Sequence, residues 1–201
     1  MALQGVSGTG KSTLGSALAK ILDVPFLDGD DLHPVSNVEK MSSGHPLNDE
    51  DRQPWLELIR TTAERIVVER KANSQTNNRF GVVVGCSALK KYYRDVLRGI
   101  VAPATEDQQL SKQRPAQSNF LPTYFVFIDG SRETLVERME KRTDHFMKPS
   151  MLDSQLTTLE SPIGEEGVVV VSLNDTTDMQ VMQALDGLRR FPGCDIVERQ
   201  S

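Results

Sequence analysis

Residues 5–12 form a glycine-rich loop, Gly-Val-Ser-Gly-Thr-Gly-Lys-Ser, that leads directly into a segment of helical period. Two glycines with four residues between them, followed by lysine and serine, match the pattern of a phosphate-binding loop. In such a loop, backbone N–H groups surround the phosphates, Lys11 reaches the β and γ phosphates, and the Ser12 hydroxyl is a ligand for Mg²⁺. A glycine-rich turn that only caps a helix is the alternative. The pattern predicts that ATP and Mg²⁺ bind here, with nucleotide ligands Gly5, Val6, Ser7, Gly8, Thr9, Gly10, Lys11, Ser12 and Thr13.

Short apolar runs alternate with longer segments of helical period, which is the pattern of a parallel sheet with crossover helices. The runs at Gly81–Cys86, Thr123–Ile128 and Gly167–Leu173 show little polar alternation, so they look like strands covered on both faces. We therefore expect an α/β fold in one domain over residues 1–201. Because only residues 1–4 precede the phosphate loop, the first strand is expected to be truncated.

Three segments have the periodicity of amphipathic helices: 11–22, 55–66, and a last one that opens at Thr176 or Thr177. Asp49 or Asp51 with Pro54 provides a start for the second. Two polar, turn-rich stretches, 71–80 and 103–122, are expected to be surface insertions. The expected apolar faces consist of Leu14, Ala17, Leu18, Ile21 and Leu22, then Trp55, Leu58, Ile59, Thr62 and Ile66, and finally Met179, Met182, Leu185 and Leu188.

A formal net charge of -5 and a pI near 5.3 argue against nucleic acid or an anionic membrane surface as the main partner. Any anionic ligand must therefore be met by a local cluster of cations. Cys86 and Cys194 are far apart, and the chain shows no leader or long apolar stretch, so we expect reduced thiols and a cytoplasmic protein.

A carboxylate cluster, Asp28-Gly29-Asp30-Asp31, follows the short run at 25–27. Ligands of an α/β sheet bind outside the carboxyl ends of its strands, so these acids lie where chemistry is expected. If the strand continues through them, Asp28 and Asp30 project to the same side. Phosphoryl transfer to an alcohol needs Mg²⁺ and a base or positioner for the attacking hydroxyl, and the two carboxylates suit these roles. A solvated acidic turn is the alternative.

Three long motifs carry a family resemblance: Leu27–Ile59, Gly85–Gly99 and His145–Pro162. Together they resemble gluconokinase, an ATP-dependent kinase of D-gluconate, within the P-loop kinases that also include shikimate kinase and the nucleoside monophosphate kinases. The resemblance covers almost the whole chain apart from the two insertions. It implies a three-layer P-loop NTPase sandwich with a five-stranded parallel sheet in the order 2-3-1-4-5. It further implies a substrate-binding helical part at about 31–72, a lid at about 138–152, and a homodimer.

The resemblance also implies roles for single residues. Asp30 would contact the acceptor hydroxyl as base or orienter, and Asp28 would hold water on Mg²⁺, with Ser12 as the other metal ligand. By analogy with shikimate kinase, Arg52 would bind the substrate carboxylate, which its planar fork matches. An Arg52 paired with Asp49 or Asp51 is the structural alternative.

Further candidates for the substrate site follow the third strand. Gly85 would let the backbone approach a polyol closely, and Lys90, Lys91 and Arg94 would supply cations, although a solvated helix face also explains either lysine. Cys86 is interpreted as a packing residue. The three histidines lack the short spacings of a zinc site. The complete predicted set of substrate-binding residues is Asp30, His33, Arg52, Gly85, Ser87, Lys90, Lys91 and Arg94.

Arg138 and Arg142 lie four residues apart and precede the motif at 145–162. In the resembled kinases an arginine-bearing lid folds over ATP, where positive charge stabilises the transferring phosphoryl group. Arg138 is therefore a predicted catalytic residue beside Lys11 and Asp30, and Arg142 a predicted nucleotide ligand. A plain surface helix is the alternative.

The leading hypothesis is transfer of the γ-phosphate of ATP to the 6-hydroxyl of D-gluconate, giving 6-phospho-D-gluconate. A kinase of another small polyhydroxy acid such as shikimate is a second hypothesis. The third is a catalytically impaired nucleotide-binding protein, because the first strand is short.

Overall fold

The computed structural model describes residues 1–73, 80–100, 121–140, 149–192 and 194. The predicted insertion at 103–122 lies almost entirely outside these residues, and so do the middle of the stretch at 71–80 and the middle of the predicted lid. The elements are β1 (Ala2–Gln4), α1 (Lys11–Leu22), β2 (Phe26–Asp28), the 3₁₀ turn η1 (Gly29–Leu32), α2 (Val35–Ser42), α3 (Asp49–Asn73), β3 (Val83–Gly85), α4 (Lys91–Arg98), β4 (Phe125–Asp129), α5 (Arg132–Glu140), α6 (Pro149–Thr158), β5 (Val168–Ser172) and α7 (Thr177–Leu188).

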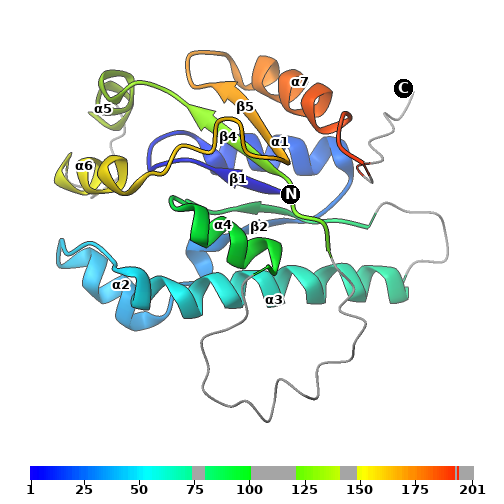
Figure 1. Cartoon of the computed structure of the whole chain (residues 1–201), viewed down its shortest axis with the longest axis horizontal. Coiled ribbons are helices and arrows are strands. Elements are labelled where there is room, and N and C mark those ends of the chain that lie inside the picture. Colours follow the sequence, from blue (N-terminus) through cyan, green and yellow to red (C-terminus); the bar gives the residue numbers. More distant parts are fainter. Residues whose placement is uncertain (74–79, 101–120, 141–148, 193, 195–201) are drawn as a thin grey trace, which may run out of the picture.

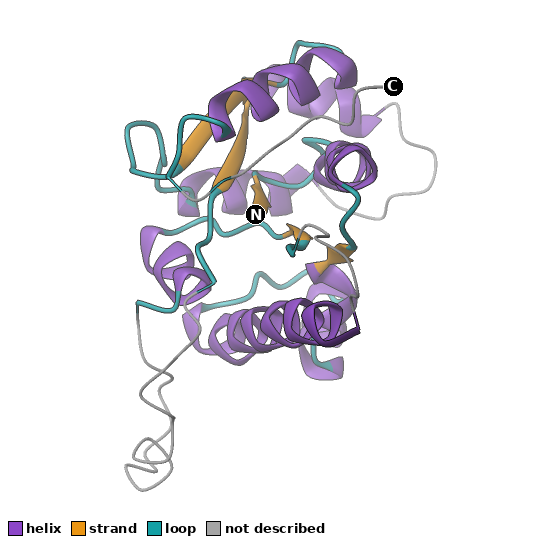
Figure 2. Ribbon diagram, turned by 90° about the vertical axis from the view of Figure 1, so that its right-hand side faces the viewer, coloured by secondary structure: helices purple, strands orange, loops and turns teal. Residues whose placement is uncertain are grey.

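The five strands form one parallel sheet in the order β2-β3-β1-β4-β5, as the resemblance implied. In Figure 1, α1 lies behind the sheet and α4 in front of it, while α7 lies beside α1. The view turned by 90° shows helices on both sides of the strands (Figure 2). The predicted three-layer α/β class is therefore confirmed.

β1 occupies the centre of the sheet, where its three residues pair with both β3 and β4. All three side chains are buried, and Leu3 is in full contact with the core. The first strand is short, as expected, but β2 and β3 also have three residues each. The three neighbouring strands β2, β3 and β1 therefore share the same short length, and β1 is as long as its partner β3.

The predicted helix at 11–22 is confirmed, with Leu14 and Leu18 buried, although Ile21 is half exposed. The last helix begins after Thr176, whose side chain accepts a hydrogen bond from the backbone N–H of Met179 (3.3 Å), a standard N-cap. The expectation that Met179 and Met182 line its buried face is wrong. Val181 and Ala184 fill those positions instead, because the helix is rotated toward them, and both methionines face solvent.

β5 forms the edge of the sheet, and apart from the buried Val171 its side chains are only partly covered. The expectation of burial on both faces is therefore wrong for this strand, while it holds for β4, in which residues 125–128 are buried. Within the described residues, no helix has the length and apolar character needed to cross a membrane.

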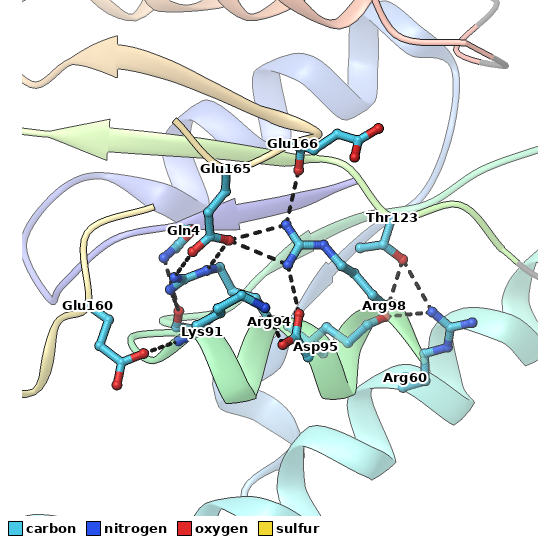
Figure 3. A network of polar contacts seen from close by, with 12 residues as sticks. Gln4, Arg60, Lys91, Arg94, Asp95, Arg98, Thr123, Glu160, Glu165 and Glu166 are labelled. Atoms are coloured by element: carbon cyan, nitrogen blue, oxygen red, sulfur yellow. Dashed lines mark hydrogen bonds and ion pairs between the residues drawn. The ribbon is translucent and has the colours of Figure 1, made fainter. Parts of the chain in front are cut away.

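Arg94 is the centre of a polar network beneath the sheet (Figure 3). Its side chain is fully buried, and its guanidinium pairs with both carboxylate oxygens of Glu165, 71 residues along the chain. It also donates to the backbone carbonyls of Ala88 (3.2 Å) and Leu89 (3.3 Å). Arg98 reinforces Glu165 at 3.4 Å. The network fixes the turn after β3 and the segment before β5 to α4.

Ala88 shows why that turn needs external support. It has a φ of 40°, in the left-handed region that residues with a Cβ seldom adopt. Its carbonyl oxygen accepts from Arg94 and also from the Nε2 atom of buried Gln4, at 3.0 Å. Two side chains from different elements therefore hold this carbonyl and impose the unusual conformation.

We expect Glu165→Ala to lower the free energy of unfolding by about 3 kcal/mol, because the buried Arg94 charge would lose its carboxylate. The pair keeps the pKa of Glu165 below its usual 4.5, so its contribution is present above that pH and is lost as the pH falls below it. Thermal unfolding at pH 7 and pH 4 measures both effects. The matched control is Glu166→Ala, since Glu166 contributes only its backbone carbonyl to Arg98. Equal melting temperatures for the two variants at pH 7 would contradict the assignment.

Candidate active site

The phosphate loop connects β1 to α1 at the carboxyl edge of the sheet, where ligands bind in α/β folds. Gly8 and Gly10 have φ values of 85° and 90°, which glycine adopts without strain. Gly8 also lies under α5, because a Cβ at this position would come within 3.1 Å of the Met139 side chain. The glycines at 8 and 10 therefore allow the tight turn, and the one at 8 allows α5 to approach.

Lys11 and Ser12 begin α1 directly after the loop. The Lys11 ammonium donates to the Val6 carbonyl at 3.1 Å, so its side chain folds back across the loop. The Ser12 hydroxyl donates to Asp28 Oδ2 at 2.7 Å. Mg²⁺ prefers oxygen ligands, uses few from the protein and keeps several waters. A hydroxyl and a carboxylate in contact at the mouth of the phosphate loop fit that ion.

Asp28 ends β2, and Asp30 does not continue the strand. A 3₁₀ turn begins at Gly29, and Asp28 Oδ1 caps it by accepting from the Asp30 backbone N–H at 3.1 Å. The condition under which both carboxylates would project to the same side, a strand that continues through Asp30, is therefore not met. The turn directs the Asp30 side chain outward, where it is 73% exposed and accessible to a ligand.

His33 and Trp55 fix this turn to α3. The Trp55 indole N–H donates to the Gly29 carbonyl at 2.7 Å, and the His33 ring stacks on the indole with centroids 4.1 Å apart. His33 Nε2 lies 4.0 Å from Asp30 Oδ1. Burial lowers the pKa of His33 below its usual 6.5, although Asp30 opposes the shift, so the ring is neutral at pH 7. His33 therefore lies beside Asp30 without forming an ion pair at that pH.

Arg52 is buried on α3, and its Nη1 donates to the Tyr93 hydroxyl at 3.3 Å while the guanidinium carbon lies 5.6 Å from the Tyr93 ring centroid. The alternative in which Arg52 pairs with Asp49 or Asp51 is not observed. Asp49 is taken by Lys90, 2.7 Å from each carboxylate oxygen, and by Tyr93. Lys90 and Tyr93 thereby hold the pKa of Asp49 below its usual value. Among the described residues, no carboxylate lies within ion-pair distance of Arg52.

Asp51 is likewise occupied elsewhere. Its carboxylate accepts from Lys40 on α2 at 2.5 Å and from the Asn48 backbone N–H at 2.8 Å. These contacts depress the pKa of Asp51. The pair joins α2 to the start of α3, which leaves the Arg52 guanidinium facing the aromatic ring of Tyr93.

Cys86 follows β3 directly and belongs to the core. Its thiol is fully buried, and burial raises its pKa to about 12, so it is protonated and unreactive as a nucleophile at neutral pH. The charges of Asp30, Lys11 and Arg52 all influence it in addition.

The neighbouring Gly85 allows close packing. A Cβ there would lie 3.3 Å from the Phe26 ring and 3.7 Å from Asp28 Oδ1. Gly85 therefore makes room for Phe26 of β2 and for the Asp28 carboxylate, in addition to any role toward a ligand. Ser87 follows and is partly exposed.

Two predicted substrate ligands lie away from this group. Lys91 is exposed and pairs with Asp95 on its own helix at 2.6 Å, as the alternative of a solvated helix face required. Arg94 has no exposed surface, and Glu165 and two backbone carbonyls occupy its guanidinium. Both residues lie on α4, whereas Lys90 is the N-cap residue that precedes this helix and pairs with Asp49 on α3.

Arg138 lies on α5, one residue before Met139, which contacts the phosphate loop. Its Nη2 donates to the Leu173 carbonyl at the end of β5, which links α5 to that edge of the sheet. Arg142 lies outside the described residues. Sequence reasoning missed the polar roles of Trp55 and Tyr93, and it missed Gln155, whose side-chain oxygen accepts from the backbone N–H of Ser7 at 2.7 Å.

The comparisons with known proteins agree with this arrangement. The chain matches the model of the shikimate kinase family over residues 7–185. It is 40% identical to the thermosensitive gluconokinase of Escherichia coli K12 over 86% of this chain and 78% of that protein. It is 42% identical to the gluconokinase of Gluconobacter oxydans over 86% of this chain and 81% of that protein. The crystal structure of a gluconokinase from Sinorhizobium meliloti 1021 matches with a TM-score of 0.70 and 42% identity, covering 94% of this chain and 90% of that one.

Proposed function

This chain belongs to the gluconokinases within the shikimate kinase family, and from that premise we propose that it transfers the γ-phosphate of ATP to the 6-hydroxyl of D-gluconate. In this reaction the hydroxyl oxygen forms a bond to the γ-phosphorus while the bond from that phosphorus to the β–γ bridging oxygen breaks. The hydroxyl proton leaves to a base, and ADP is released with 6-phospho-D-gluconate. This step needs both a phosphate side, which binds ATP, and an acceptor side, which binds the attacking hydroxyl.

The phosphate side of the proposal rests on the loop at 5–12. The Lys11 ammonium lies across this loop on the Val6 carbonyl, and in such loops the lysine reaches the β and γ phosphates. Ser12 and Asp28 would hold Mg²⁺, directly or through water, because their oxygens are already in contact. When bound, the ion neutralises charge that develops on the phosphate oxygens. The Arg138 side chain is a further proposed source of positive charge, since α5 packs on the loop.

The acceptor side rests on Asp30, which we propose as the base or orienter of the attacking hydroxyl. Its carboxylate is exposed, yet its backbone is fixed by Asp28 and by the Trp55 contact to Gly29. A group that is accessible but held in place suits the positioning that phosphoryl transfer requires.

The observation that carries the choice of acceptor is the buried Arg52 guanidinium, which has no carboxylate partner among the described residues. A buried cation is costly to leave unpaired, so a ligand with its own carboxylate suits the site. D-gluconate provides a carboxylate at one end and a primary hydroxyl at the other. Arg52 and Asp30 would bind the two ends, with Lys90 nearby at the N-cap of α4.

The test is ADP release measured by a coupled assay with D-gluconate, D-glucose, shikimate, CMP and AMP as acceptors. We expect turnover with D-gluconate to exceed that with each of the others by about a hundredfold or more, because glucose lacks the carboxylate that Arg52 would bind. Higher turnover with shikimate than with D-gluconate would instead support the second hypothesis, a kinase of another small polyhydroxy acid. Absence of turnover with every acceptor would point to a protein that binds nucleotide without catalysis.

A further inference from the structure

The phosphate loop is contacted by a side chain from the far end of the chain. Gln155 lies on α6, and its Oε1 accepts from the Ser7 backbone N–H at 2.7 Å. The two residues are separated by 148 positions, so tertiary structure alone brings them together. Of the loop residues, Ser7 lies between Val6, whose carbonyl accepts from Lys11, and Gly8, which packs under α5.

The chemistry of this contact fixes the orientation of the carboxamide. A backbone N–H can only donate, so it must face the oxygen of Gln155, and the Nε2 group then points the other way. Over the part of the chain that the structure describes, that nitrogen has no hydrogen-bond partner. Gln155 therefore presents two N–H donors beside the loop while its oxygen is used to hold the loop.

The backbone of α6 is well anchored for such a role. Leu152, one turn before Gln155, is fully buried in the core. Asp153 accepts from Arg132 on α5 at 2.7 and 3.1 Å. Beyond the helix, Glu160 accepts from the Lys91 backbone N–H at 2.6 Å and donates its own N–H to the Leu89 carbonyl at 2.9 Å. Contacts on both sides thus fix the helix that carries Gln155.

We propose that Gln155 is a ligand of the terminal phosphate of ATP, with its Nε2 donating to a phosphate oxygen while its Oε1 holds Ser7. The position of Lys11 indicates which phosphate is involved. In a phosphate loop the lysine reaches the β and γ phosphates, and here its ammonium lies on the carbonyl of Val6, the residue next to Ser7. This end of the loop is therefore where the terminal phosphates are expected. The inference rests on one part of the proposed function, the binding of ATP at the phosphate loop. It does not depend on the identity of the acceptor.

Binding of ATP and of ADP, measured by calorimetry with Mg²⁺ and no acceptor, tests this directly. Gln155→Glu keeps the shape of the side chain and the acceptor for Ser7, but it removes the donor and adds a negative charge. We expect ATP to bind about tenfold more weakly or worse, whereas ADP affinity changes less than about threefold. Gln155→Met, of similar length without polar atoms, should also lower the ATP-to-ADP affinity ratio and serves as the second variant if the first does not fold.

The matched control is Thr157→Glu, two residues along α6 and therefore on a different face, where the side chain is exposed. This variant should bind both nucleotides as the unmodified protein does. If Gln155→Glu weakens ATP and ADP equally, or weakens neither, Gln155 only shapes the loop and the proposal is overturned. If the unmodified protein binds neither nucleotide, the proposed function itself fails, which is a distinguishable result.

Discussion

Asp30→Asn is expected to lower kcat by about 10²–10⁴-fold while ATP affinity stays close to that of the unmodified protein. An amide has the shape of the carboxylate but cannot accept the hydroxyl proton. The Asp30 backbone contact to Asp28 does not depend on the Asp30 side chain, so the turn and the Asp28 carboxylate should remain in place. Steady-state ADP release with D-gluconate and direct ATP binding measure the two quantities.

Asp31 offers a matched control for this experiment, since it lies in the same 3₁₀ turn and is also exposed. Asp31→Asn removes the same charge one residue away and should keep kcat within about twofold, as is usual for an exposed substitution outside the site. Loss of turnover in both variants would mean that general acidity of the turn matters rather than a specific base. An Asp30→Asn enzyme with unchanged kcat would remove Asp30 from the chemistry.

Arg52→Met is the second substitution with a large expected effect. Methionine retains much of the apolar contact with Tyr93 but removes the proposed partner of the substrate carboxylate. Loss of a buried charge pair costs about 2 kcal/mol or more, which corresponds to about a 30-fold decrease in kcat/KM for D-gluconate. The decrease should fall mainly on the KM for D-gluconate, and the KM for ATP should change little.

Arg65→Met is the corresponding control on the same helix, because Arg65 is exposed and pairs only with Glu69 at 3.1 Å among the described residues. It should leave both KM values unchanged. If Arg52→Met raises the KM for ATP and for D-gluconate alike, the guanidinium supports the structure of the site as a whole. The proposed carboxylate contact would then be wrong.

The strands themselves and the phosphate loop could be predicted from the sequence because they depend on local signals. The phosphate loop fixes its own chemistry through glycine spacing, and apolar runs such as 125–128 identify the strands. The strand order itself came from family resemblance, since no pattern within the chain reports which strands are neighbours. The structure brings Asp28 into contact with Ser12 and buries Arg52, while their roles toward Mg²⁺ and the substrate stay predictions.

The roles of Arg94 and Gln155 could not be obtained in this way. Lys90, Lys91 and Arg94 look equivalent as charges on one short helix, and only the packing shows that Arg94 is directed inward. Its partner Glu165 is 71 residues distant, and Gln155 is 148 residues from Ser7. Contacts of this range are set by tertiary structure, and an uncharged glutamine gives no compositional signal. The prediction that Met179 is buried was wrong for a related reason, since periodicity alone does not fix how far a helix is rotated about its axis.

The link between Lys90 and Asp49 has a consequence for attempts to redirect this enzyme to other acceptors. Residues 31–72 are the predicted substrate-binding part and would be the segment to exchange. However, the Asp49 carboxylate accepts hydrogen bonds from Lys90 and Tyr93, which lie at the start of α4, and the Trp55 indole donates to the Gly29 carbonyl. If residues 31–72 alone were replaced by those of another kinase, the new segment would meet an α4 region that does not match it. Chimeras in which residues 85–94 are transferred together with residues 31–72 would keep the contacts of Asp49 with Lys90 and Tyr93. They are therefore the better starting point for engineering.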